Sequence, residues 1–179
     1  MSAGVAKGTS PRLAAVRAYL AVSGALNLLW EAGQLPLYTV WREGTPRGMA
    51  FTVLHCTAGD LLLASLILSG ALLVAGGPAW PKRHIARVAA LGLVAGLACT
   101  AILEWLNVEI WRNWAYSDLM PVLPPFGTGL SPMLQWLLIP SAALWTAHRA
   151  GAASPEVRPR EGLHKCGVPP PAARQLARD

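Results

Sequence analysis

Residues 61–75 read LLLASLILSGALLVA and contain no charged side chain. Residues 88–103, VAALGLVAGLACTAIL, form a second uncharged stretch. A helix needs about 20 mostly apolar residues, at about 1.5 Å rise per residue, to cross the hydrocarbon core of a bilayer. The sequence therefore predicts an all-α membrane protein, a bundle of four transmembrane helices. The segments that meet this length, if their ends hold a few polar groups, are 14–38, 50–75, 86–110 and 130–149.

The composition of the 179 residues supports this prediction, since 54% are hydrophobic and only 13% are charged. A soluble domain usually has about 25% charged residues. The polar residues gather at one end of each segment, whereas the helices of a soluble bundle carry a polar stripe along their whole length. The first segment continues into EAGQLPLYTVW with no small-residue cleavage site, so we expect an uncleaved span rather than a signal peptide.

The basic residues predict the orientation of the spans. The chain carries a net charge of +6, and twelve of its fifteen Lys and Arg residues fall before the first segment, between the second and third, or after the fourth. Cytoplasmic loops collect Lys and Arg, so we expect both termini to be cytoplasmic in a bacterial inner membrane. No basic patch interleaved with aromatic residues suggests nucleic acid, so the expected partner is the lipid bilayer.

These spans divide the chain into three parts. Residues 1–13 form a polar cytoplasmic N-terminal segment, residues 14–149 form the transmembrane domain, and residues 150–179 form a tail rich in Pro, Ala, Arg and Gly. The tail lacks hydrophobic periodicity, so we expect it to be disordered in the cytoplasm. The third connection, about 111–130, is rich in aromatic residues and Pro and should lie at the outer interface, as a lid over the bundle or as an ordinary anchored loop.

Polar side chains occur at the same depth in all four predicted spans. Because the spans alternate in direction, the polar groups of each one fall toward the outer leaflet. Random scatter would not favour this arrangement. The residues are Asn27, Glu31 and Gln34 in the first span, Thr52, His55, Cys56 and Asp60 in the second, Thr100, Glu104 and Asn107 in the third, and Gln135 in the fourth.

The first and third spans share one spacing. Asn27, Glu31 and Gln34 are spaced i, i+4 and i+7, as are Thr100, Glu104 and Asn107, and each set falls on one narrow face of a helix. Trp111 would extend the second stripe. Both helices run in the same direction, so the match points to two repeated helical hairpins about an axis normal to the membrane.

The ionisable groups predict a functional site. A charged group inside a span costs a few kcal/mol on insertion scales and marks a site by default. Three carboxyls at close range in a low dielectric cannot all be ionised, so two of them should share a proton, which is a basis for acid–base chemistry. The candidate catalytic residues are Glu31, His55, Asp60 and Glu104, with Glu104 or Glu31 as acid and His55 or Asp60 as base.

We expect a small apolar or lipid-like ligand in a pocket open toward the outer leaflet. Such pockets are mostly apolar with a few convergent polar groups. A tryptophan, Trp30 or Trp105, would stabilise a cation in an isomerase or cyclase reaction. The candidate ligand-binding residues are Asn27, Trp30, Gln34, Trp105, Asn107, Trp111 and Gln135.

Three other interpretations remain open. The polar groups would form a structural core that fixes helix packing, or they would carry protons or cations in a transporter or transporter subunit. Transport through four spans would need a homodimer, and the Leu, Val and Ala residues in the inner halves of the spans argue against it. His55 and the carboxyls would suit a metal, but the sequence has no HExxH or ExxH spacing, so we expect no metal and no cofactor.

Four sequence blocks carry a resemblance: NLLWEAGQLPLYTVWREG, FTVLHCTAGDLLLA, EWLNVEIWRNWAYSDLMP and GTGLSPMLQWLLIP. They resemble a set of small bacterial four-span membrane proteins with no assigned function, over about residues 14–148. The resemblance implies a multi-span membrane protein and no activity. The combination of His, carboxyls, Trp and Asn is also loosely similar to sterol isomerases of the emopamil-binding type, in chemistry rather than in motif.

Overall fold

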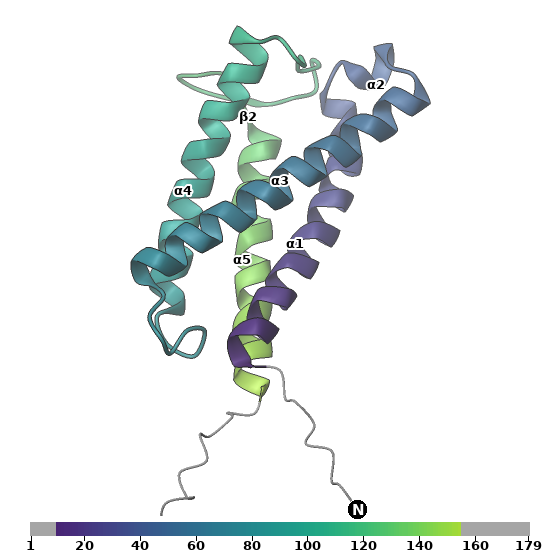
Figure 1. The fold of residues 1–179 in the computed structure, drawn as a ribbon. Helices are drawn as coiled ribbons and strands as arrows, with labels where there is room; N and C mark the ends of the chain where they lie inside the picture. Colours follow the sequence, from purple (N-terminus) through teal and green to yellow (C-terminus); the bar gives the residue numbers. More distant parts are fainter. Residues whose placement is uncertain (1–9, 155–179) are drawn as a thin grey trace, which may run out of the picture.

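The computed structural model describes residues 10–154. Residues 1–9 of the expected N-terminal segment and residues 155–179 of the expected disordered tail lie outside the described residues. The described chain is mostly helical (Figure 1). Its elements are α1 Pro11–Gln34, η1 Leu35–Leu37, α2 Val40–Glu43, α3 Pro46–Ala75, α4 Ile85–Trp105, η2 Leu106–Ile110, β1 Val122–Leu123, β2 Thr128–Gly129 and α5 Leu130–Ala153.

The first two long helices begin earlier than the hydrophobic pattern predicts, because each has a cap followed by proline. The Ser10 hydroxyl accepts from the backbone N–H of Leu13, and Pro11 occupies the first turn of α1. Thr45 accepts from the N–H of Gly48 at 3.1 Å ahead of Pro46 at the start of α3. Such caps satisfy N–H groups that have no partner within the helix, and proline has a suitable φ for its first turn.

A wide turn ends the α4 segment. Residues 106–110 form the π-helix η2, in which the N–H of Trp111 bonds to the carbonyl of Leu106 at 2.7 Å. Arg112 then adopts a left-handed φ of 53°. The turn changes the angular step between residues, so the stripe of Thr100, Glu104 and Asn107 does not continue to Trp111. The prediction for Trp111 was wrong, since its side chain is 56% exposed.

The last helix continues past the predicted end at residue 149 to Ala153. Gly151 allows this, because it is buried against the turn that joins α3 to α4. A Cβ atom at Gly151 would lie 2.2 Å from Cγ of Pro81. The chain from residue 150 to 153 therefore belongs to the helical bundle and not to the tail.

The four long helices form a ring in the order α1, α3, α4, α5, in which each packs against its two neighbours. The described chain starts and ends at one end of the ring, which also holds the α3–α4 turn; we call this the basic end. The other end, the cap end, holds residues 35–45 and 111–129 (Figure 1). Helix α3 crosses the bundle diagonally and diverges from α4 toward the cap end (Figure 1).

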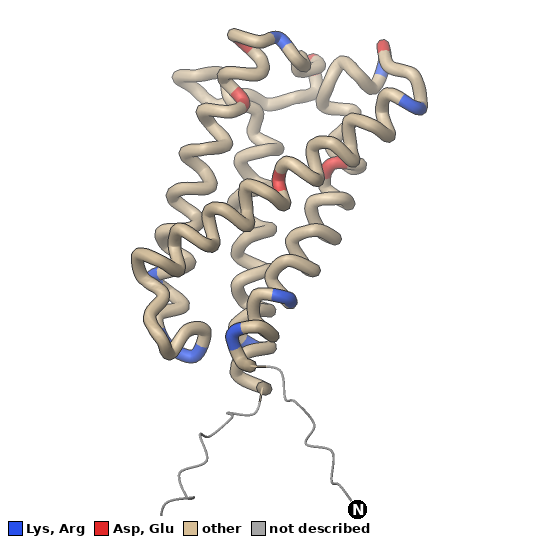
Figure 2. Tube along the Cα trace, viewed as in Figure 1, with Lys and Arg blue, Asp and Glu red and all other residues tan. Residues whose placement is uncertain are grey.

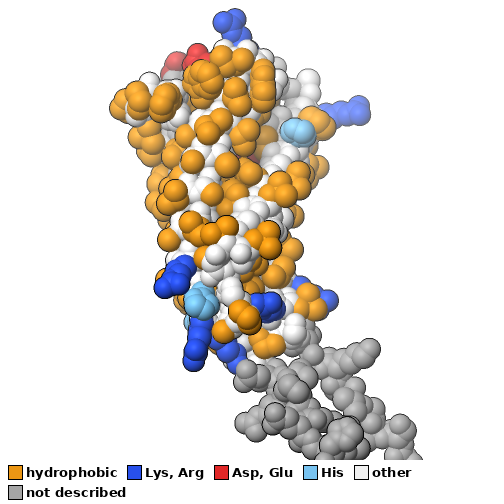
Figure 3. Space-filling view, turned by 60° about the vertical axis from the view of Figure 1, so that its left-hand side comes forward, with side chains coloured by type: hydrophobic (Ala, Val, Ile, Leu, Met, Phe, Trp, Pro, Cys, Tyr) orange, Lys and Arg blue, Asp and Glu red, His pale blue; other side chains and the backbone are white. Residues whose placement is uncertain are grey.

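Three helical segments are long and apolar enough to cross a membrane: Pro11–Leu37, Pro46–Ala75 and Ile85–Ile110. Hydrophobic side chains cover the middle of the surface, whereas Lys and Arg lie toward its two ends (Figures 2 and 3). Helix α5 is as long as α1, at 24 residues, and its sequence includes Gln135 and Pro140. Much of α5 is buried against α1 and α4, so less of its surface must be apolar.

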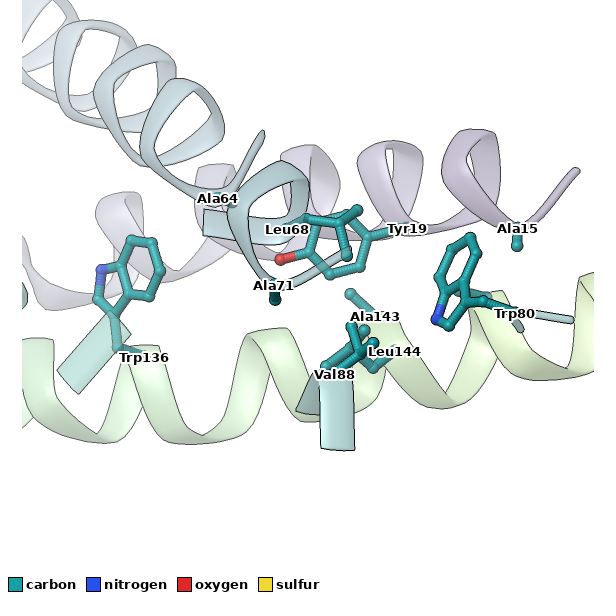
Figure 4. Close-up of a cluster of buried hydrophobic side chains, with 11 residues drawn as sticks. Ala15, Tyr19, Ala64, Leu68, Ala71, Trp80, Val88, Trp136, Ala143 and Leu144 are labelled. Carbon is teal, nitrogen blue, oxygen red and sulfur yellow. The ribbon is translucent and has the colours of Figure 1, made fainter. Parts of the chain in front are cut away.

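A core of apolar side chains fills the basic half of the ring. Tyr19 of α1 and Leu68 of α3 pack over Ala143 and Leu144 of α5, and Trp80 from the α3–α4 turn closes one side (Figure 4). Trp136 belongs to the same cluster and lies on its cap side (Figure 4). Close packing of this kind leaves little room for water.

Gly96 sets the distance between α4 and α5. A Cβ atom there would lie 2.6 Å from Cε3 of the buried Trp136, whereas a Cβ atom at Gly92 would meet only Cγ2 of Ile67, at 3.9 Å. We expect Gly96→Ala to lower the stability by about 1–3 kcal/mol through overpacking. Gly92→Ala should be neutral or stabilising by up to about 1 kcal/mol, because alanine favours the helix.

Thermal unfolding of the two variants in a mild detergent, followed by circular dichroism, tests this difference. Equal melting temperatures for Gly96→Ala and Gly92→Ala would contradict the close approach of α4 to α5.

Candidate functional site

A cavity of about 790 Å³ opens inside the ring at the cap end. All four long helices and both cap-end connections contribute to its wall. The helices bring together most of the residues that the sequence predicted for the site. Those that line the cavity are Glu31, Gln34, His55, Asp60, Glu104, Asn107 and Gln135.

Two helices carry a row of buried residues with the same spacing. On α1 these residues are Ser23, Asn27, Glu31 and Gln34, and on α4 and η2 they are Gly96, Thr100, Glu104 and Asn107. In a helix, residues three and four apart share a face. The polar ends of both faces meet inside the ring because α1 and α4 stand at opposite positions of it.

Gln135 of α5 is the centre of a hydrogen-bond network. Its Nε2 lies 2.8 Å from Oδ1 of Asn27, 2.9 Å from Oε1 of Glu31 and 2.8 Å from Oδ2 of Asp60. Its Oε1 accepts from Nε2 of Gln34 at 3.3 Å. Gln135 is only 2% exposed, so these bonds replace water for a fully buried amide.

Glu31 and Asp60 are adjacent and short of donors. The two N–H bonds of the Gln135 amide cannot serve three acceptors at full strength. Gln34 adds one more bond to Oε1 of Glu31, at 2.8 Å. Two neighbouring carboxylates with only neutral donors repel each other strongly in an apolar bundle. We therefore expect Glu31 and Asp60 to share one proton.

Glu104 has a different set of partners, from the third connection. The Tyr116 hydroxyl donates to Oε2 of Glu104 at 2.5 Å and accepts from the backbone N–H of Gly129 at 2.9 Å. Burial raises the pKa of Tyr116, and its hydrogen bond to Glu104 raises it further. Tyr116 therefore remains a protonated donor, which ties Glu104 to the start of α5.

The third connection covers the cavity and is joined to the first. Thr39 donates its backbone N–H to the carbonyl of Ala115 at 3.0 Å, and Ser117 donates to the carbonyl of Leu37 at 2.9 Å. The rings of Tyr38 and Tyr116 lie 5.6 Å apart. The two alternatives for this segment were a lid and an ordinary loop; its position over the cavity and its bonds to residues 37–39 suit a cover.

Tyr38 is a site residue that the sequence pattern did not reveal. It follows the short helix η1 and lines the cavity. Burial raises the pKa of its hydroxyl, as does the nearby charge of Glu104. Its position could not be read from helical periodicity, because it lies in a connection.

His55 lies at the edge of the cavity. Its side chain is exposed, and its ring stacks on Phe51 with centroids 5.5 Å apart. Within residues 10–154 it forms no hydrogen bond to any of the three carboxyls. His55 thus shares the cavity wall with the carboxyls but, in the described residues, is not hydrogen-bonded to them.

The three tryptophans predicted for ligand binding lie outside the cavity. Trp30 and Trp105 each adjoin a buried glutamate in sequence, so a rotation of about 100° directs them elsewhere. Trp30 lines a separate open pocket of about 500 Å³ beside α1 and α5, where its indole donates to Ser131. Trp105 is 41% exposed, and Trp111 follows the π turn onto the surface.

Asn27 also lies outside the cavity wall and acts through Gln135. The aromatic residues that do line the cavity are Tyr38, Phe51, Trp114 and Trp136. Trp136 could have been predicted, because it adjoins Gln135 on the helix that is most buried. Trp114 comes from the third connection, where no periodic pattern places it.

Thr100 completes the site. It lines the cavity and is only 5% exposed, yet its hydroxyl has no hydrogen-bond partner among residues 10–154. A buried polar group without a partner costs about 1–3 kcal/mol. This hydroxyl is available to a ligand.

Cationic partners are missing around the carboxyls. Within the described part of the chain, no Lys or Arg bonds to Glu31, Asp60 or Glu104. In the same residues, no group of three or more His, Cys, Asp and Glu side chains is placed to hold a metal ion. Among the described residues, the polar groups of the cavity wall are therefore acidic or neutral apart from His55 at its edge.

Comparison with known proteins gives no match to a family model, to a curated protein or to a solved structure. The geometry of the cavity is therefore the basis for any functional argument.

Gln135 provides a test of the network. Replacing it by leucine keeps a similar volume but removes the shared donor of Asn27, Glu31 and Asp60. Each buried group left unsatisfied costs about 1–3 kcal/mol, so Gln135→Leu should lower the melting temperature clearly. Leu137→Ala, at a 43% exposed position of the same helix, is the control. If the two variants melt alike, the network contributes nothing to stability.

Proposed function

We propose that the chain is a four-span protein of the bacterial inner membrane, with both termini in the cytoplasm, that binds a small apolar or lipid-like molecule in the cap-end cavity or converts it by acid–base chemistry. The observation that carries this proposal is the cavity of about 790 Å³ with three carboxyls in its wall. Ligand sites are commonly of this size, mostly apolar, with a few convergent polar groups.

The four-span count is supported by the arrangement of α5. It runs the length of the bundle beside α1 and α4, and two hairpins bring both described ends of the chain to the basic end. The excess of Lys and Arg at that end favours its placement in the cytoplasm. The resemblance to small four-span bacterial proteins is consistent with this count.

The matched buried faces of α1 and α4 support two repeated hairpins, α1–α3 and α4–α5. The two hairpins differ, because α3 diverges from α4 at the cap end (Figure 1). On this proposal the cavity is the place where the symmetry of the repeat is broken. The residues that α3 adds to the wall, from Phe51 to Leu63, follow from this divergence.

The divergence of α3 from α4 also supports entry from the side. Leu63 and Leu103 line the cavity on these two helices, and Leu103 is 39% exposed. An apolar molecule in the bilayer would pass between α3 and α4, beneath the cover of residues 111–129. This path keeps its apolar part in contact with lipid until it reaches the carboxyls.

The acid–base roles follow from the hydrogen bonds. The Glu31–Asp60 pair, with one shared proton, is the proposed proton donor. Glu104, held by Tyr116, is the proposed carboxylate that accepts a proton or stabilises a developing positive charge. His55 at the edge of the cavity is the less suitable base.

The two alternatives are less well supported. A transporter needs access from both ends, and the apolar core around Tyr19, Leu68 and Leu144 fills the basic half of the ring. A purely structural polar core would explain the saturated amides of Gln34 and Gln135. It would not explain the cavity beside them or the unpartnered hydroxyl of Thr100.

Native mass spectrometry of the gently solubilised protein tests the proposal. The wild-type protein should carry a discrete bound molecule, and Glu104→Gln should lose it, because Glu104 lines the cavity. Glu109→Gln, an exposed position on the same segment, should retain it. If the wild type is bare and as stable as Glu104→Gln, the cluster serves packing only.

The four-span count has a separate test in cells. With the native cysteines replaced by serine, Asp118→Cys should react with a membrane-impermeant maleimide applied from the periplasmic side. Ser154→Cys should not react until the membrane is opened, because α5 separates the two positions. Labelling of both positions in closed cells would contradict a crossing by α5.

A further inference from the structure

The charge balance of the cavity describes its ligand more closely. Three carboxyls contribute to the site, and the Lys and Arg residues at the cap end are exposed rather than turned toward them. These residues are Arg42, Arg47 and Arg112. In the described residues, the hydrogen-bond donors that reach the carboxyls are neutral groups, namely amides, a tyrosine hydroxyl and the indoles of Trp114 and Trp136.

One shared proton does not neutralise the site. If Glu31 and Asp60 hold a proton between them, that pair keeps one negative charge. Glu104 lies within electrostatic reach of Glu31, and an ionised Glu104 would add a second negative charge. Neutral donors reduce the cost of a buried charge but do not cancel it. A positive charge on the ligand would complement the cavity.

Thr100 is an independent sign of a missing ligand. Its hydroxyl is buried and unpartnered in the cavity wall, one helical turn from Glu104. A hydroxyl oxygen accepts from N–H or O–H groups. An ammonium group between the carboxyls would supply such a donor.

Aromatic side chains flank the same space. Tyr38, Trp114 and Trp136 contribute to the wall around the carboxyls. The face of an aromatic ring attracts a cation that lies within about 6 Å of its centroid, and more strongly where water is excluded. Leu63, one turn beyond Asp60 on α3, and Leu103, next to Glu104 on α4, also line the cavity and offer apolar contacts to the rest of a ligand.

We propose that the ligand is a cationic amphiphile, in which an amine or quaternary ammonium head lies between the Glu31–Asp60 pair and Glu104 while an apolar body extends between α3 and α4. This inference rests on the proposed function, because it names the chemical class of the ligand for the same cavity. An anionic head such as a phosphate would face three carboxyls without a cation to bind it. A metal ion lacks a suitable ligand group within residues 10–154.

Equilibrium binding to the full-length protein in phosphatidylcholine nanodiscs tests the charge of the ligand. The probe is radiolabelled dodecyltrimethylammonium below its micelle concentration, with empty nanodiscs subtracted. We expect saturable binding that dodecanol and dodecanoate displace at least about tenfold less well, which is the effect of about 1.4 kcal/mol.

Two variants locate the head group. The double variant Glu31→Gln/Asp60→Asn should weaken binding of the probe about tenfold, because it removes the one negative charge that the pair keeps. Glu109→Gln, an exposed carboxyl outside the cavity, should leave binding unchanged. Elution as a single species and an unchanged melting temperature establish that each variant is folded.

Thr100→Val separates a hydrogen bond from a charge effect. Protonated dodecylamine can donate to the Thr100 hydroxyl, whereas dodecyltrimethylammonium has no N–H group. The variant should bind dodecylamine at least about threefold less tightly and the quaternary probe as before, since a net hydrogen bond contributes about 0.5–1.5 kcal/mol. Its stability should not fall, because the hydroxyl has no partner to lose.

The outcomes separate this inference from the proposed function. If dodecanol displaces the probe as well as dodecylamine does, the proposal of a cationic head group is wrong, although the cavity still binds an apolar ligand. If the probe does not bind but native mass spectrometry finds a bound molecule that Glu104→Gln loses, the same conclusion holds. If neither experiment finds a ligand, both proposals fail.

Discussion

Three carboxyls inside an apolar bundle, with no Lys or Arg bonded to them in residues 10–154, impose the constraint on which the cap half of this structure depends. Each carboxyl must find neutral donors, and the donors come from elements far apart in the chain. Gln135 of α5 reaches Glu31 of α1 and Asp60 of α3 at once, so the amide joins three helices. Tyr116 reaches Glu104 and also accepts from Gly129, so the third connection is held over the ring. The geometry of the cavity follows from these bonds.

The two halves of the bundle differ in how closely their side chains pack. Close packing in the basic half, around Tyr19, Leu68 and Leu144, uses small residues such as Ala143 and Gly151 to bring helices together. The cap half is less closely packed and encloses the cavity, because α3 diverges from α4. A bundle that is closely packed at one end can keep the arrangement of its helices while the other, open end holds buried charge.

The length and apolar content of the segments were enough to predict four long helices and their approximate limits. The convergence of Glu31, Asp60, Glu104 and Gln135 was predicted from their common depth in the spans, and from the helical spacing of Glu31 and Glu104 with their polar neighbours, because a regular helix fixes where such residues point. Periodicity failed where the helix is not regular or is absent. The π turn removed Trp111 from its stripe, and Tyr38 and Trp114 reach the cavity from connections whose course depends on long-range hydrogen bonds. Trp30 and Trp105 failed for a simpler reason, since each is rotated by about 100° from the neighbouring glutamate and lies on the side away from the cavity.

The divergence of α3 from α4 determines from which phase a ligand would arrive. A cavity entered from between two lipid-facing helices draws on the molecules dissolved in the bilayer rather than on those in water. Each buried methylene favours the bilayer by about 0.8 kcal/mol, so an amphiphile accumulates there by many orders of magnitude. The site could then be filled by a ligand that it holds only weakly. Occupancy would follow the mole fraction of that ligand in the membrane, and an affinity expressed per volume of water would change with the amount of lipid present.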